Sequence, residues 1–233
     1  MDELDLIRFD SENPHILAAY KLEAHGKYLD AINEYHRAIE EEPNLVIVYK
    51  HIGNIYYRLG QLSKAEQYLL LAVEKMPEFP TPRFELAMCY YRQARIKKAI
   101  DMLLNVLELD NNFLLAHYWM GIMYYQYGLP CKARDEFRYV VTVNQEFTIA
   151  YYHLGVANLR LGNYEEAVTN FTKLTSVNPD SPIAHALLGD AYLSLDKKLE
   201  ARRSYKIALE LDPDDKKAKN GLLLASEMNE NLM

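Results

Sequence analysis

Seven histidines are the side chains of this 233-residue chain with the widest capacity for catalysis or metal binding. His15, His117 and His185 are separated by multiples of 34 residues, which predicts that they pack between repeated elements. His51 and His153 share a second register, but they lie three intervals apart, too far to bind one metal ion through bonds of about 2 Å. The sequence therefore predicts no histidine-based active site and no metal site.

Two cysteines and one glycosylation sequon also carry potential chemistry. Cys89 and Cys131 form neither a CxxC pair nor a disulfide framework, which favours a reduced, intracellular compartment. We expect Cys89 to be a small buried apolar residue, whereas Cys131 follows Pro130 at a helix start, where a thiol can be activated. The sequon at residues 170–172 includes Phe171, which occupies a buried register, so we expect it to remain unmodified.

Motifs that position a catalytic metal, a nucleophile or a phosphate are missing from the sequence. It contains no HExxH or GxSxG motif and no GxGxxG or GxxxxGK(S/T) loop. We therefore expect neither enzymatic activity nor a cofactor.

Charge and hydrophobicity limit the remaining functions. The net charge of −7 argues against nucleic-acid binding, which needs clustered Lys and Arg. The longest apolar runs, such as Leu69–Val73, are far shorter than the roughly 20 residues that span a bilayer. Residues 1–5 are acidic and no apolar signal-peptide core follows them. These features predict a soluble, cytoplasmic protein without membrane insertion.

An internal period of 34 residues organises the chain. One alanine register has no gap or insertion: Ala31, Ala65, Ala99, Ala133, Ala167 and Ala201. A second register holds Gly53, Gly121, Gly155 and Gly189, and a third holds Gly26, Gly60, Gly128 and Gly162. Because glycine inside a helix costs about 1 kcal/mol relative to alanine, the second register indicates close approach of helices. The third register is typical of glycines that end a helix.

The period predicts an all-α chain of helical hairpins. Six hairpins are expected over residues 12–45, 46–79, 80–113, 114–147, 148–181 and 182–215. Residues 1–11 form an N-terminal tail outside the repeat, and residues 216–233 form a C-terminal capping helix with the polar outer surface that a terminal repeat needs.

The repeats resemble the tetratricopeptide (TPR) consensus. The positions that carry this resemblance include Tyr49, Ile52-Gly53, Tyr56, Gly60, Ala65, Ala72 and Pro77, and again Gly155, Gly162, Ala167, Phe171 and Pro179. The resemblance covers residues 12–215 and departs from the pattern at Leu22, Asn111, Gln145, Asn158 and Asp196. It implies a right-handed superhelical solenoid whose concave groove binds peptides or helices of other proteins.

The resemblance also implies which residues line the groove, because the first helix of each TPR hairpin faces it. The expected lining residues are Lys50, Asn54, Tyr57, Arg58, Phe84, Met88, Tyr91, Arg92, Tyr118, Ile122, Tyr125, Tyr152 and Arg160. Tyr and Arg dominate binding hot spots because they combine large contact area with directional hydrogen bonds. Lys50 and Asn54 match part of the carboxylate clamp that holds chaperone tails, but Glu85, Leu115 and Trp119 depart from it.

Two functions remain open. The first is an adaptor that binds a partner peptide or helix, apolar with nearby acidic groups, in the groove lined by aromatic and Arg residues. The alternative is a self-assembling scaffold, a homo-oligomer in which repeats or the tail dock between copies. The tail carries Leu4, Leu6, Ile7 and Phe9 among acidic residues, which suits an aromatic, Arg-lined groove.

Overall fold

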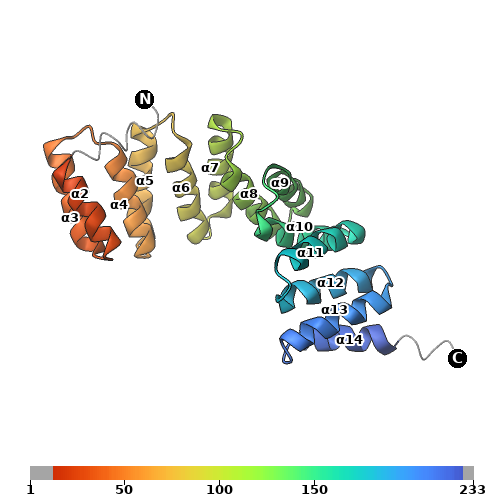
Figure 1. The fold of residues 1–233 in the computed structure, drawn as a ribbon. Coiled ribbons are helices and arrows are strands. Elements are labelled where there is room, and N and C mark those ends of the chain that lie inside the picture. Colours follow the sequence, from red (N-terminus) through yellow and green to blue (C-terminus); the bar gives the residue numbers. More distant parts are fainter. Residues whose placement is uncertain (1–12, 228–233) are drawn as a thin grey trace. The chain divides into compact units, whose positions relative to one another are not determined.

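A computed structural model describes residues 13–227 of the chain, and in this range all regular structure is α-helical. The predicted N-terminal tail lies outside the described residues, as do the last residues of the expected capping segment. Contacts divide the chain into two compact units, Met1–Ala116 (unit 1) and His117–Met233 (unit 2). Each unit is built from consecutive helical hairpins (Figure 1).

Unit 1 contains three hairpins. The first pairs α2 (Pro14–Ala24) with α3 (Tyr28–Glu41), the second α4 (Ile47–Arg58) with α5 (Leu62–Lys75), and the third α6 (Pro80–Arg92) with α7 (Ile96–Leu109). The second helix of one hairpin also packs on the first helix of the next, as α5 does on α6. The apolar core consequently continues from hairpin to hairpin instead of closing around one centre.

Unit 2 continues the same pattern. It contains most of α8 (Leu114–Gln126), followed by α9 (Pro130–Val143), α10 (Thr148–Leu161), α11 (Tyr164–Val177), α12 (Pro182–Ser194) and α13 (Lys198–Leu211). The last described helix, α14 (Lys216–Glu227), packs on α13 and α12. The prediction of an all-α chain with six hairpins and a final helix is confirmed for the described residues.

The two glycine registers have the physical reasons expected of them. At Gly155 a Cβ atom would overlap the ring of Phe171 on α11, so only glycine lets the two helices approach this closely. Gly121 faces Phe137 in the same way, whereas Leu69 faces Gly53. The Tyr56 ring stacks on Tyr68 with centroids 5.5 Å apart.

Helix ends follow the local chemistry of the sequence. Asn13 caps α2 by accepting hydrogen bonds from the backbone N–H groups of His15 and Ile16 at 3.0 and 3.2 Å. Pro130 starts α9, as predicted, because its missing N–H needs no partner in a first helical turn. In the register that follows the first helices, glycines have positive φ, and Ala94 and Asp196 adopt the same conformation, with φ of 58° and 57°.

Candidate functional site: the first-helix faces

The exposed sides of the first helices, called here the first-helix faces, carry a repeated arginine–tyrosine contact. In unit 1 the Arg92 guanidinium lies 4.5 Å from the centroid of the Tyr57 ring and donates to the Tyr57 carbonyl oxygen at 2.6 Å. In unit 2 Arg160 lies 5.1 Å from the centroid of the Tyr125 ring. Both pairs are separated by 35 residues, the repeat length plus one, so the repeat itself brings them together.

The remaining arginine among the expected lining residues makes a different contact at the same spacing. Arg58 lies 35 residues after Glu23, and its Nη1 is 3.7 Å from a Glu23 carboxylate oxygen. All three arginines are exposed, so part of each guanidinium can contact a partner. A stacked guanidinium keeps donors at its edge for a carboxylate while its face rests on the ring.

Other expected lining residues contribute less surface. Lys50 and Met88 are only 8% and 9% exposed. Asn54 donates through its side-chain amide to Glu85 Oε1 at 2.8 Å. A carboxylate of the chain itself therefore occupies the amide that a carboxylate clamp would offer to a partner.

Several expected aromatic residues serve packing as well as surface. Phe84 contacts Phe113, with ring centroids 5.2 Å apart. Tyr118 lies among Phe137, Phe147 and His153, with centroid distances of 6.1, 5.0 and 5.7 Å. The remaining expected residues, Tyr91, Ile122, Tyr125 and Tyr152, are partly exposed on the first helices.

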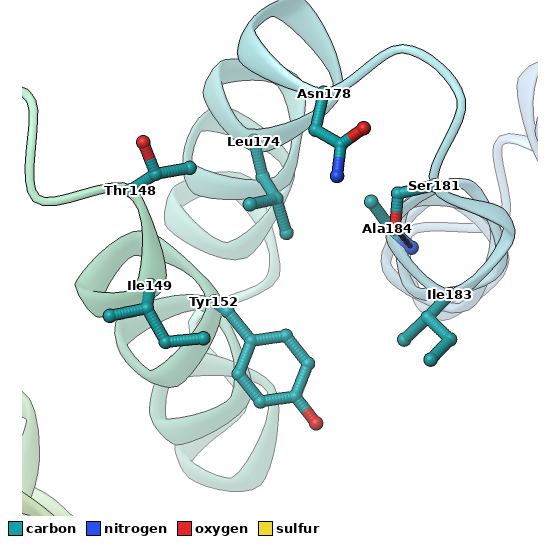
Figure 2. Close-up of a pocket in the computed structure, with 8 residues that line it drawn as sticks. All are labelled: Thr148, Ile149, Tyr152, Leu174, Asn178, Ser181, Ile183 and Ala184. Carbon is teal, nitrogen blue, oxygen red and sulfur yellow. Dashed lines mark hydrogen bonds between the residues drawn. The ribbon is translucent and has the colours of Figure 1, made fainter. Parts of the chain in front are cut away.

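A pocket of about 450 Å³ opens on the first-helix face of unit 2, between α10, α11 and α12. Figure 2 shows Ile149 and Tyr152 on one side, Ile183 and Ala184 across from them, and Leu174 between the helices. Tyr152 was expected at the site, whereas Ile149 and Ile183, which are 49% and 60% exposed, were not expected there. The repeat could have predicted them, since they lie 34 residues apart and each stands six residues before a packing glycine.

Several histidines make contacts within or between hairpins. His15 bonds to Glu34 and His117 to Glu136, both at 2.6 Å and both within one hairpin, whereas His185 Nε2 lies 2.8 Å from the carbonyl oxygen of Pro179 in the preceding repeat. The His51 ring stacks on Tyr35 of the preceding hairpin, with centroids 5.5 Å apart. The Tyr20 hydroxyl lies 3.2 Å from His51 Nε2.

Charge is strongly disfavoured on His51. Burial, together with the nearby charges of Lys50 and Arg58, lowers its pKa to about 4. His153 occupies the same register in unit 2, stacks on Phe137 with centroids 5.2 Å apart, and has a pKa lowered by burial. Both rings therefore act as neutral aromatic wedges between hairpins near neutral pH.

The two cysteines differ in burial. Cys89 is buried, as expected, and burial raises its pKa to about 11, which suppresses the thiolate. Cys131 is exposed. Among residues 13–227, no group of three His, Cys, Asp or Glu side chains is placed to hold a metal ion. None of the described helices combines the length and hydrophobicity needed to cross a bilayer.

Comparison with known proteins places this geometry in context. A family model described as "Tetratricopeptide repeat" matches residues 16–81, 128–171, 152–216 and 187–232. No curated protein matches the chain in sequence.

Solved structures share the fold at low sequence identity. YrrB, described as a TPR protein with an unusual peptide-binding site, is 21% identical with a TM-score of 0.71, over 84% of this chain and 97% of that one. MamA from Desulfovibrio magneticus is 21% identical with a TM-score of 0.68, over 73% and 97% of the two chains. A TPR protein from Parabacteroides merdae is 20% identical with a TM-score of 0.68, over 91% and 97%.

Proposed function

Because the chain belongs to the tetratricopeptide repeat family, whose members generally mediate protein–protein interactions, we propose that it is an adaptor that binds a peptide or helix of a partner protein on its first-helix faces. The observation that carries this proposal is the repeated arginine–tyrosine contact, Arg92 over Tyr57 and Arg160 over Tyr125. Each pair presents a large aromatic surface and a fixed cation at one position, the combination that dominates binding hot spots.

The chemistry of these faces defines the partner. Tyr91, Tyr125 and Tyr152 offer aromatic surface, and the pocket in unit 2 can receive a bulky apolar side chain. The exposed arginines attract acidic groups, although the whole chain has a charge of −7. The partner segment therefore combines apolar or aromatic side chains with nearby Asp or Glu. The peptide-binding site described for YrrB is consistent with this use of the fold.

Truncating an aromatic residue tests the proposal most directly. The partner is first recovered with the full chain and then titrated against Tyr91→Ala, Tyr125→Ala and wild type. Each truncation should weaken binding by about 2 kcal/mol if the tyrosine is a hot spot. Leu104→Ala on α7 is the matched control, because Leu104 is 43% exposed on a second helix. Circular dichroism should show unchanged helical content for all variants.

Arg92→Ala separates electrostatic steering from contact. Loss of the Arg92 charge should lower the association rate at low salt. The difference in association rate from wild type should shrink once added salt brings the screening length below about 10 Å. If all three variants bind as wild type does, while Leu104→Ala abolishes binding, the first-helix faces are not the interface.

A further inference from the structure

A second pocket lies on the opposite, second-helix side of unit 1. It has a volume of about 620 Å³ and is enclosed by α3, α5 and the start of α4. Tyr49 and Tyr68 supply its aromatic walls, and Ile39, Leu70 and Leu71 supply its aliphatic ones. We call it the outer pocket.

Apolar side chains at the outer pocket are left in contact with water. Leu70 and Leu71 are 45% and 37% exposed, although neighbouring Leu69 and Ala72 on the same helix are fully buried. Tyr68 is held in place by stacking on Tyr56. The pocket thus places an anchored aromatic ring beside exposed aliphatic side chains, with the polar His36, Gln67 and Glu74 completing its lining.

The rim of the outer pocket is acidic. Glu74 lines the pocket, and Glu40 lies one helical turn after His36, a lining residue on α3. Both carboxylates are exposed, and neither has an ion-pair partner within 4.0 Å among the described residues. The Lys75 ammonium lies 5.3 Å from the centroid of the Tyr49 ring, so one ring of the pocket already receives a cation.

Charge differs between the two sets of helices in unit 1. The second helices α3, α5 and α7 carry eight acidic and five basic residues. The first helices α2, α4 and α6 carry five basic and two acidic residues, although Lys50 is buried. The second helices therefore favour a basic segment, and the first helices favour an acidic one.

We propose that the outer pocket is a second docking site, whose occupant is a basic amphipathic segment of a partner protein. One bulky apolar side chain of that segment enters between Tyr49, Tyr68 and Leu71. Lys or Arg residues on either side of it pair with Glu40 and Glu74. The chain then joins two partners of opposite charge, one on each side of unit 1.

Two matched synthetic peptides test this site with the full-length chain. Each is a capped amphipathic helix of about 14 residues, or about four turns, with one Phe among leucines. The first carries lysines on its polar face, and the second carries glutamates at the same positions. Binding is measured by isothermal titration calorimetry, and the mass of the complex by light scattering.

The lysine peptide should bind, and the glutamate peptide should bind at least about tenfold more weakly at this site. The double variant Glu40→Lys with Glu74→Lys should reverse the preference. Leu71→Ser should weaken the lysine peptide about tenfold, whereas Tyr91→Ala on the first-helix face should leave its affinity unchanged. Leu71 is partly exposed, so its substitution should preserve helical content.

Several results would overturn the inference. These are equal affinity for the two peptides, unchanged affinity of the double variant, or no binding of the lysine peptide up to about 1 mM. A concentration-dependent dimer that Leu71→Ser abolishes, without peptide binding, would assign the pocket to a second copy of the chain. Because the glutamate peptide has the chemistry proposed for the first-helix partner, both peptides are also titrated against Tyr91→Ala, and the two affinities are compared in that variant. Binding that Tyr91→Ala removes is assigned to the first-helix faces and not to the outer pocket.

Discussion

Polar contacts supplement the apolar packing between neighbouring hairpins of unit 1, whereas one junction of unit 2 is filled by apolar side chains. In unit 1 Asn54 donates to Glu85 across one junction, and Arg95 pairs with Glu66 at 2.7 Å across the same two hairpins. His51 lies beside the Tyr20 hydroxyl at the preceding junction. In unit 2 a junction is filled by Phe171, Leu174, Ala184, Leu187 and Leu188 among other buried residues.

The difference shows that the repeat spacing and the junction chemistry are separate properties. The same 34-residue period places the helices in both units, because small residues in fixed registers set the distance between helices. The side chains that fill each junction vary from repeat to repeat. We therefore expect the units to differ in their response to overpacking and to pH, although their helices follow one pattern.

The largest expected effect comes from overpacking an apolar junction. Gly155→Leu would drive a side chain into the Phe171 ring, which is fully buried, and should cost at least about 3 kcal/mol. Gly53→Leu in unit 1 would meet the flexible Leu69 side chain instead and should cost less. Hydrogen exchange should show faster opening around residues 148–181 in the first variant, with near-normal protection in unit 1. Equal loss across both units would argue against local cooperativity in the array.

The second-largest expected effect is a loss of stability in unit 1 on acidification. His51 has a pKa of about 4 in the folded chain, below its ordinary value near 6.5, so the unfolded chain binds more protons between these pH values. Its contribution to stability is full above about pH 6.5 and is lost as the pH falls towards 4. The limit is about 3 kcal/mol, from 1.36 kcal/mol per pKa unit. Unit 1 should thus lose protection more steeply than unit 2 over this range.

A control isolates the histidine. His51→Phe keeps an aromatic ring at the junction and removes the titrating group, so the acid sensitivity of unit 1 in this pH range should decrease. His153→Phe should have a smaller effect on the pH dependence of unit 2. If His51→Phe leaves the pH profile of unit 1 unchanged, the neutral wedge does not control its acid stability.

The carboxylate of Glu66 should act at still lower pH. Burial opposes ionisation of Glu66, but hydrogen bonds from Gln93 and Arg95 outweigh it and lower the pKa of the carboxyl. The Glu66 contribution is present above its ordinary pKa and is lost as the pH falls below it. Glu66→Gln should destabilise unit 1 at neutral pH by about 1 kcal/mol and flatten its unfolding profile below pH of about 4.5. Urea unfolding followed by hydrogen exchange would measure both.

The smallest expected effects concern the two residues that replace glycine where a first helix ends. Ala94 in unit 1 has φ of 58°, which costs an alanine about 1 kcal/mol, so Ala94→Gly should stabilise the chain by about 0.5–1 kcal/mol. Asp196 in unit 2 has φ of 57°, but Asp tolerates this conformation better, so Asp196→Gly should gain less. Thermal unfolding of both variants would show which substitution raises the stability of the chain more. A larger gain at Asp196 would contradict the conformational explanation.

The sequence by itself determined the helices and their order. The period of 34 residues, the packing glycines and the helix-ending glycines predicted every hairpin that the described residues contain. The glycine signals act locally, since each depends on backbone conformation or on the size of one side chain. The shared register of Arg58, Arg92 and Arg160 was also visible, because a repeat places equivalent residues on the same face of each first helix.

Only the tertiary structure decided what each exposed residue contacts. The 35-residue pairing of Arg92 with Tyr57, the capture of Asn54 by Glu85, and the burial of Lys50 all depend on how far one hairpin is rotated against the next. Both pockets likewise arise where side chains of three consecutive helices leave a hollow, so their shape depends on how these helices pack. A repeat fixes the register of each residue, but the rotation between hairpins determines which registers meet, because that rotation depends on the packing of all the side chains at the junction.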